Sequence, residues 1–478
     1  MHESTTHRSL AVLFSLATLA LFACTDTETV FVDRPLFDDP PAGASGFLGY
    51  GTEDAEAEKF PVCGNCHIGT QSEWEGTHHA DAWATLQANS HAQELCEACH
   101  TVSENGNAAE GDAGWVATGD PRYHDVQCES CHGPGSGHLS NPEAYQPLAS
   151  IKVDVDLTSG CGECHQGSHH GFVEDWANSR HGFEGSEFPR GREGCQDCHE
   201  GRRVLQIFGV NTDYIEKDEA ENLPIVCVVC HDPHSNATNE HQLRFPIDVA
   251  SIEENLCMKC HHRRAVPEVE SDHGLEPHSP QGPLLLGEGV GWIPPNFDTN
   301  IVRGTHGSAQ NEKLCATCHV HAREITDPVT GDFVLESHGH LFEPIPCLDE
   351  QGRPISNGTC DITERSFDAC VECHGDETSA LTAYLAATER IDDRVAQLAA
   401  LLAQVPDTEL DPADDVLTVA EGALFNQNLA EIRSSAVHNP FLTEALLLGS
   451  IKAVQDEYGL AAVMSATEID RRMQEISK

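Results

Sequence analysis

The chain has 478 residues, of which 78 are Asp or Glu and only 27 are Lys or Arg, so its formal net charge is -51. Phosphate backbones repel a chain this acidic, which excludes nucleic acid as a natural partner. The acidity provides solubility or suits a salty medium, or it steers cationic partners and metal ions toward the protein.

Residues 1–23 have the composition of a secretory signal, because a basic residue precedes an apolar run that is too short to span a bilayer. The end of that run together with Cys24 resembles a bacterial lipobox, in which Cys24 becomes the lipidated first residue of the mature protein. Phe22 is bulky for its position, so cleavage by an ordinary signal peptidase is the alternative. Thr25 after the cysteine favours the outer membrane, with the protein facing the periplasm or the cell surface.

Residues 24–59 are rich in Asp, Glu, Pro and Gly and have no sustained periodicity. We expect a flexible acidic tether between the lipid and the first folded module. No later segment is long and apolar enough to be expected to span a bilayer.

Residues 60–375 contain nine copies of the pattern Cys-x-x-Cys-His. Two thiols at this spacing form thioethers with the vinyl groups of a heme, and the adjacent imidazole ligates its iron. A zinc site or a disulfide would not place a histidine after the second cysteine every time. The predicted attachment cysteines are Cys63, Cys66, Cys96, Cys99, Cys128, Cys131, Cys161, Cys164, Cys195, Cys198, Cys227, Cys230, Cys257, Cys260, Cys315, Cys318, Cys370 and Cys373. The predicted proximal iron ligands are His67, His100, His132, His165, His199, His231, His261, His319 and His374.

The sequence therefore predicts nine c-type hemes, and their spacing constrains the fold. The first seven motifs follow one another at a near-constant step, whereas the last two steps are much longer. A near-constant step indicates a repeated unit of one heme and one short connecting segment. So little polypeptide per heme requires neighbouring hemes to pack against one another. We expect mostly irregular coil with short α-helices around a stacked heme array, and little or no β-structure.

Histidine is the expected sixth ligand of the irons. The chain has only 4 methionines, so histidine–methionine ligation cannot be general, and ligation by two histidines implies low potentials. Local context ranks the free histidines: two follow the spacing Trp-x-x-Thr/Ser-x-His, and others adjoin a motif across Gly- or Pro-containing turns. The candidate distal ligands, most of which we expect to bind iron, are His79, His91, His138, His170, His181, His234, His278, His306, His340 and His438. His169 is the alternative to His170, His124 is undecided, and His241, His262, His273, His321 and His338 are assigned no ligand role.

Cys347 and Cys360 are outside the nine motifs. In an exported protein they are expected to form a disulfide that closes a Pro- and Gly-rich loop. Free or intermolecular thiols are the alternative.

Residues 376–478 contain no heme motif and are expected to form an α-helical bundle. Apolar residues at steps of three or four predict a helix over residues 377–405, ended by Pro406. Further helices are expected over residues 414–436 and from Pro440 to Tyr458, with Pro440 in the first turn. Either the bundle packs back and donates His438 to a heme, or it forms an interface in a homo-oligomer.

The stretch Cys128–His138, which reads CESCHGPGSGH, and the Trp-x-x-Ser-x-His pattern resemble the cytochrome c-554 group of multiheme proteins. The segment from Cys227 to His262 is similar to the doubled motifs of bacterial respiratory cytochromes. The resemblance covers roughly residues 60–262. It implies hemes with two histidine ligands, stacked in pairs, that conduct electrons between respiratory partners. The resemblance supports His138 and His181 as distal ligands, and it supports His79 and His234 more weakly.

Three functions agree with these features. The first is an exported electron carrier between other redox proteins, such as periplasmic or outer-membrane cytochromes and reductases, or toward an extracellular acceptor. The second is an oxidoreductase that acts on a small nitrogen or sulfur compound at a heme with an open axial site, although no motif ends in Lys as in the pattern that resembles ammonia-forming nitrite reductases. The third is a subunit of a cytochrome filament, which a lipid anchor on every copy argues against.

Overall fold

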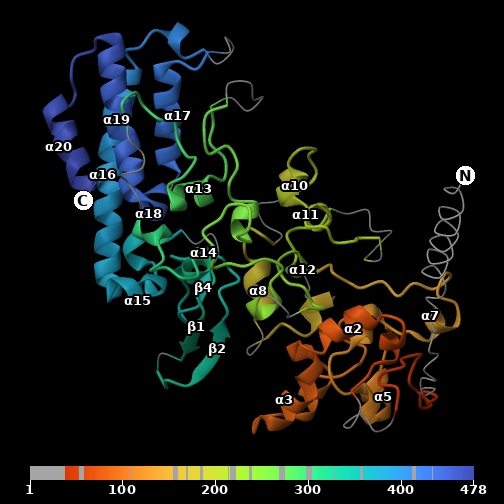
Figure 1. Cartoon of the computed structure of the whole chain (residues 1–478). Helices are drawn as coiled ribbons and strands as arrows, with labels where there is room; N and C mark the ends of the chain where they lie inside the picture. The colour runs from red at the N-terminus through yellow and green to blue at the C-terminus, as the bar shows by residue number, and fades with distance from the viewer. Residues whose placement is uncertain are drawn as a thin grey trace, which may run out of the picture. The chain divides into compact units, whose positions relative to one another are not determined.

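The computed structural model describes residues 38–52, 59–107, 109–153, 160–167, 171–182, 187–213, 215, 222–235, 239–268, 275–297, 304–327, 329–355, 359–411, 416–432 and 434–477 (Figure 1). The chain divides into one unit of residues 1–38 and a second of residues 39–478, and only the second is considered below. The predicted signal, Cys24 and His170 lie outside the described residues. Within them, none of the helices combines the length and apolar character needed to cross a membrane.

Short helices joined by coil make up the described part of residues 60–375. The α-helices are α2 (Ile68–Trp74), α3 (Ala82–Ala88), α4 (Glu94–Glu97), α5 (Gly114–Thr118), α6 (Cys128–His132), α7 (Ser136–Ser140), α8 (Phe172–Ala177), α9 (Glu187–Arg190), α10 (Gln196–His199), α11 (Gly201–Ile207), α12 (Cys227–Cys230), α13 (Gln281–Leu286), α14 (Cys315–His319) and α15 (Val371–His374). Short 3-10 helices are η1 (Val62–Asn65), η2 (His78–Asp81), η3 (Pro121–Tyr123), η4 (Gly160–Glu163), η5 (Glu240–Gln242), η6 (Cys257–Lys259), η8 (Thr305–Gly307), η9 (Ile362–Glu364) and η10 (Asp368–Cys370).

The heme motifs themselves account for many of these helices. Cys128–His132 and Cys315–His319 each form one complete short helix, α6 and α14. In a helical turn, residues three apart lie on the same face, so both thiols of a motif are directed to one side. Gly133 ends α6 at a φ of 75°, a left-handed conformation that glycine adopts without strain.

A tryptophan ties each of two motifs to a distant segment. The indole Nε1 of Trp74 donates a hydrogen bond to the carbonyl of Val126 at 3.0 Å. The indole Nε1 of Trp176 donates in the same way to the carbonyl of Ile225 at 2.7 Å. Each acceptor lies two residues before the first cysteine of a motif. Both indoles are buried, so each bond is shielded from water.

The rest of the Trp-x-x-Thr/Ser-x-His pattern completes this connection. The backbone N–H of Val126 donates to the carbonyl of His79, and that of Ile225 donates to the carbonyl of His181, both at 3.1 Å. The hydroxyls of Thr77 and Ser179 donate back to the carbonyl of the tryptophan three residues earlier. The hydrogen bonds of the Trp-x-x-Thr/Ser-x-His pattern therefore hold its histidine beside a later motif.

Strands are few and short among the described residues. β1 (Arg323–Thr326) and β2 (Phe333–Ser337) pair antiparallel, with Arg323 opposite Ser337. β3 (Cys347–Leu348) pairs antiparallel with β4 (Pro354–Ile355). A disulfide joins Cys347 to Cys360, whose Cα atoms lie 6.0 Å apart. The predicted fold class, helix and coil with little β-structure, is confirmed.

The C-terminal residues form longer helices, together with the 3-10 turn η11 (Asp407–Glu409). They are α16 (Glu377–Leu402), α17 (Val419–Glu431), α18 (Ser435–His438), α19 (Pro440–Tyr458) and α20 (Ala466–Ile476). Figure 1 shows α16, α17 and α19 side by side. Their shared core is aliphatic and includes Leu398, Leu401, Ala420, Leu447 and Ile451.

Side-chain caps fix where these helices begin. Asp376, Thr418, Asn439 and Ser465 each accept a hydrogen bond from a backbone N–H of the following first turn. The helix expected over residues 414–436 starts later, at Val419, and is split into α17 and α18. α20 was not among the expected helices.

Candidate heme-binding sites

Eight of the nine motif histidines face a second imidazole ring at almost the same separation of ring centres. At 6.2 Å lie the pairs His67–His138, His132–His234, His165–His79, His199–His278, His231–His340, His319–His438 and His374–His306. The pair His261–His181 has a separation of 6.1 Å.

This separation matches the chemistry that the motifs require. Imidazole nitrogens bind transition metals at about 2 Å, so two imidazoles on opposite sides of one ion have ring centres about 6 Å apart. Rings in direct contact have centres anywhere from about 4.5 to about 7 Å apart, so it is the almost identical separation in all eight pairs that indicates a metal between the rings. The residues therefore fit an iron, with the plane of a porphyrin, between the two rings of each pair.

Eight of the ten candidate distal histidines are members of these pairs. His91 is not brought to a motif: among the described residues no ring contact joins it to a motif histidine, and its side chain is exposed. Its backbone N–H instead donates to the side chain of Asn89 at 2.8 Å. His170 lies outside the described residues, and His124 stacks on Trp83 with 4.0 Å between ring centres.

Backbone carbonyls orient many of the paired rings. The Nδ1–H of His132 donates to the carbonyl of Pro147 at 3.0 Å, and that of His319 donates to the carbonyl of Phe342 at 2.9 Å. The distal ring of His306 donates in the same way to the carbonyl of Val437 at 2.6 Å. With its proton on Nδ1, each ring keeps the Nε2 lone pair for a metal.

The ninth motif histidine, His100, is oriented similarly. Its Nδ1–H donates to the carbonyl of Ala82 at 3.0 Å. The sequence contained no signal for these carbonyl acceptors, because every residue carries a carbonyl and only the tertiary fold selects one.

Burial keeps the distal rings neutral. Burial and neighbouring imidazoles lower the pKa of His181 to about 3 and that of His438 to about 3. The pKa of His340 is lowered to about 4, again mainly by burial. A neutral imidazole retains the lone pair that a metal ligand needs, so these rings are suited to iron over the whole physiological pH range.

The C-terminal helices contribute directly to two of the pairs. α18 ends at His438, the partner of His319, and the neighbouring carbonyl of Val437 orients His306, the partner of His374. Asn439, which is buried, donates its side-chain amide to the carbonyl of Leu284 in α13 at 3.2 Å. The helical bundle is thus attached at the last two motifs.

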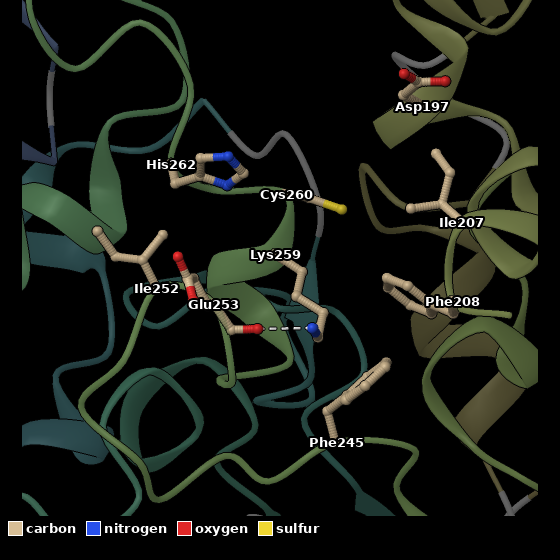
Figure 2. A pocket seen from close by; sticks show the side chains of 9 residues that line it. All are labelled: Asp197, Ile207, Phe208, Phe245, Ile252, Glu253, Lys259, Cys260 and His262. Carbon is tan, nitrogen blue, oxygen red and sulfur yellow. Dashed lines mark hydrogen bonds between the residues drawn. The ribbon is translucent and has the colours of Figure 1, made fainter.

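A cavity of about 510 Å³ adjoins the attachment cysteine Cys260 (Figure 2). Phe208, Phe245 and Ile252 are among the apolar side chains that line it. The ammonium of Lys259 lies 3.9 Å from the ring centre of Phe245. An apolar wall beside a motif cysteine would fit the face of a porphyrin, and the ammonium of Lys259, which also lines the cavity, would suit a propionate.

Comparison with known proteins agrees with these features. The family model described as cytochrome c554 and c-prime matches residues 62–133. The multiheme cytochrome MtrA of Shewanella baltica (strain OS185) is 24% identical over 195 residues, which are 37% of this chain and 54% of MtrA. The match therefore spans about half the length of that relative.

Among solved structures, the crystal structure of the outer cell wall cytochrome OcwA is similar, with a TM-score of 0.49 and 18% identity over 76% of this chain and 77% of that one. The nine motifs together with the family and sequence matches define the chain as a multiheme c-type cytochrome. Within that class it resembles the cytochrome c-554 group, as the sequence predicted, and this match covers residues 62–133.

Proposed function

We propose that the chain is an exported nonaheme cytochrome that conducts electrons between respiratory redox partners. The observation that most strongly supports this proposal is the set of eight imidazole pairs, whose ring centres lie 6.1 to 6.2 Å apart. Bound c-type hemes would supply one-electron carriers. The paired rings would fill both axial positions, exclude small ligands from the iron and lower its potential relative to methionine ligation.

Electron carriage is favoured over substrate conversion because an enzyme needs an axial position open to substrate. At eight motifs a second imidazole stands where the substrate would bind. His170, with His169 as the alternative, remains a sequence-based candidate ligand that is not assigned to a particular motif.

Export is part of the proposal. c-Type heme is attached outside the cytoplasm, and residues 1–23 read as a lipoprotein signal with Cys24 as the lipidated residue. The Cys347–Cys360 disulfide suits an oxidising compartment. The proposed location is the outer membrane, facing the periplasm or the surface, where other cytochromes, reductases or extracellular acceptors are the partners.

Heme quantification and electron paramagnetic resonance on the purified, oxidised protein test the proposal. We expect nine hemes per chain by pyridine hemochrome, low-spin ferric signals at the paired motifs, and reduction at the low potentials of histidine–histidine ligation. A predominantly high-spin spectrum that responds to nitrite, hydroxylamine or cyanide would instead indicate a catalyst.

A further inference from the structure

The thiols of different heme motifs lie next to one another in a specific order. The nine motifs are numbered in chain order, from motif one, which begins at Cys63, to motif nine, which begins at Cys370. Five pairs of thiols from different motifs interact with each other: Cys63–Cys128, Cys99–Cys164, Cys161–Cys227, Cys198–Cys260 and Cys257–Cys315. The Sγ of Cys99 also lies 3.9 Å from the carbonyl oxygen of Glu163, the residue before Cys164. These contacts join motif one to three, two to four, four to six, five to seven, and seven to eight.

Three further links come from thiols that are farther apart and interact only through their charges. Cys131 is close to Cys161, which joins motif three to four. Cys230 is close to both Cys257 and Cys260, which joins motif six to seven. Cys318 is close to Cys370 and Cys373, which joins motif eight to nine. Because each thiol is a point of heme attachment, neighbouring thiols mean neighbouring hemes.

The pattern of links repeats with a period of three motifs. Motif one contacts three, two contacts four, and three contacts four; likewise four contacts six, five contacts seven, and six contacts seven. The hydrogen bonds of Trp74 and Trp176 repeat with it, because each fastens the first part of one such unit to its third motif.

The spacing of the last motifs indicates a third unit that differs from the first two. The interval from Cys63 to Cys128 is almost as long as that from Cys161 to Cys227, and each of them encloses one further motif. The interval from Cys257 to Cys315 is only slightly shorter but encloses no motif. The two long steps near the end of the heme region therefore belong to a third unit that lacks its middle heme.

The exposure of the motif cysteines identifies the two ends of the chain of linked motifs. Among the motif cysteines, Cys66 in motif one and Cys373 in motif nine are exposed, whereas the other sixteen are partly buried. Motifs one and nine are also the two terminal positions of the chain of links.

We propose that the hemes form one line through motifs one, three, four, six, seven, eight and nine, with the hemes of motifs two and five as side branches on motifs four and seven. The line is built from three tandem units, and its two exposed ends exchange electrons with external one-electron donors and acceptors. Each transfer oxidises one heme and reduces its neighbour by one electron. The inference rests on the proposed function, since it specifies the path of that conduction.

A matched pair of variants tests the order on the full heme-loaded protein. His340→Met changes the sixth ligand in motif six, on the line, and His278→Met changes it in motif five, on a branch. Methionine raises the potential of one heme, so that heme can be reduced alone. Electron paramagnetic resonance then counts the ferric neighbours whose signals change when it becomes diamagnetic. We expect two neighbours for His340→Met and one for His278→Met.

Equal numbers of neighbours, or the reverse ratio, would overturn the branched order. If either variant fails to mature, His234→Met in motif three and His138→Met in motif one replace the pair, with two neighbours and one expected. An electron cryomicroscopy map of the unmodified protein decides independently, because the iron of motif one must lie nearer to that of motif three than to that of motif two. Loss of the proposed function would appear differently, as an incomplete heme complement or the absence of reversible reduction in the unmodified protein.

Discussion

The paired histidines are the residues on which the assignment of this chain depends most. Local sequence singled out some members of the pairs, because a histidine after a Gly- or Pro-containing turn, or after the Trp-x-x-Thr/Ser pattern, lies close to a motif in the chain. It was not enough for His91, whose Asn-Ser-His context looks similar but whose side chain is exposed. Which free histidine approaches an iron is decided by tertiary contacts between segments far apart in the chain.

Replacing His138 by Ala should open one axial position at the first motif. Its ring lies 6.2 Å from His67 and donates through Nδ1 to the carbonyl of Tyr145. We expect a high-spin ferric signal equivalent to about one heme, and carbon monoxide binding by the reduced form, because a five-coordinate iron accepts small ligands. His91→Ala is the control and should retain the parent spectrum. A high-spin signal in His91→Ala but not in His138→Ala would reverse the two assignments.

A buried aspartate next to the third motif makes stability sensitive to alkali. The Asp125 side chain is fully buried and accepts hydrogen bonds from the Tyr50 hydroxyl at 2.8 Å and the Trp83 backbone N–H at 2.9 Å. Burial, and then the charge of Asp125, raise the pKa of Tyr50 well above its ordinary value of 10.0. Burial lowers the pKa of Lys59, but its hydrogen bonds to Asp81 and Asp125 outweigh that effect and leave it raised.

Because both pKa values are higher in the folded protein, the unfolded chain releases its protons first as pH rises. This contribution to stability is therefore complete below pH 10.0 and falls above it. Thermal unfolding followed on both sides of that pH should show the loss, and Tyr50→Phe should remove the tyrosine part of it. An alkaline loss of the same size in Tyr50→Phe would show that Tyr50 does not carry it.

The C-terminal helices show what pattern can predict about an element and what it cannot. α16 and α19 were expected because apolar residues recur along them and because Pro406 and Pro440 mark a stop and a start. α20 was missed although Ile469, Met473 and Ile476 recur along it at the spacing of an amphipathic helix and Ser465 caps its first turn. Its position depends on the packing of these apolar side chains against the bundle core and on an ion pair with α19, and no local pattern indicates the ion pair.

That ion pair is the basis of a prediction about the bundle. Glu444 of α19 is fully buried and accepts from Arg472 of α20 at 2.9 and 2.7 Å. Arg390 and Arg394 of α16 lie 3.4 and 3.9 Å from the same carboxylate. Glu444→Gln removes the buried anion that these three guanidinium groups share, so we expect the bundle to lose about 3–5 kcal/mol of stability.

Glu475→Gln is the matched control, since this carboxylate is half-exposed and pairs with Arg471 and Arg472 at the surface. It should cost little, because a solvent-exposed ion pair contributes little to stability. Urea unfolding followed by the helical circular dichroism signal compares the two variants. A loss for Glu444→Gln as small as that of the control would mean that apolar packing alone holds α20 in place.

At the scale of the whole molecule, the sequence indicated a repeat of one heme, whereas the thiol contacts indicate a repeat of three. The near-constant step between the first seven motifs conceals the larger period, because every motif looks alike in the sequence. The larger period is evident only from the tertiary structure, in which Cys63 interacts with Cys128 and not with Cys96, although Cys96 is closer in the sequence.

The net charge of -51 provides a test of how the molecule meets its partners. If the charge steers reactants toward exposed hemes, the reduced protein should react faster with a cationic acceptor such as hexaammineruthenium(III) than with anionic ferricyanide, after allowance for driving force. Raising the ionic strength from about 0.01 M to about 0.1 M shortens the screening length from about 30 Å to about 10 Å. Stopped-flow rates should then fall by about tenfold for the cation and rise for the anion, because screening removes attraction in one case and repulsion in the other. If both rates respond alike, the acidic surface serves solubility, and the choice of partner depends on contacts at the exposed ends of the heme line.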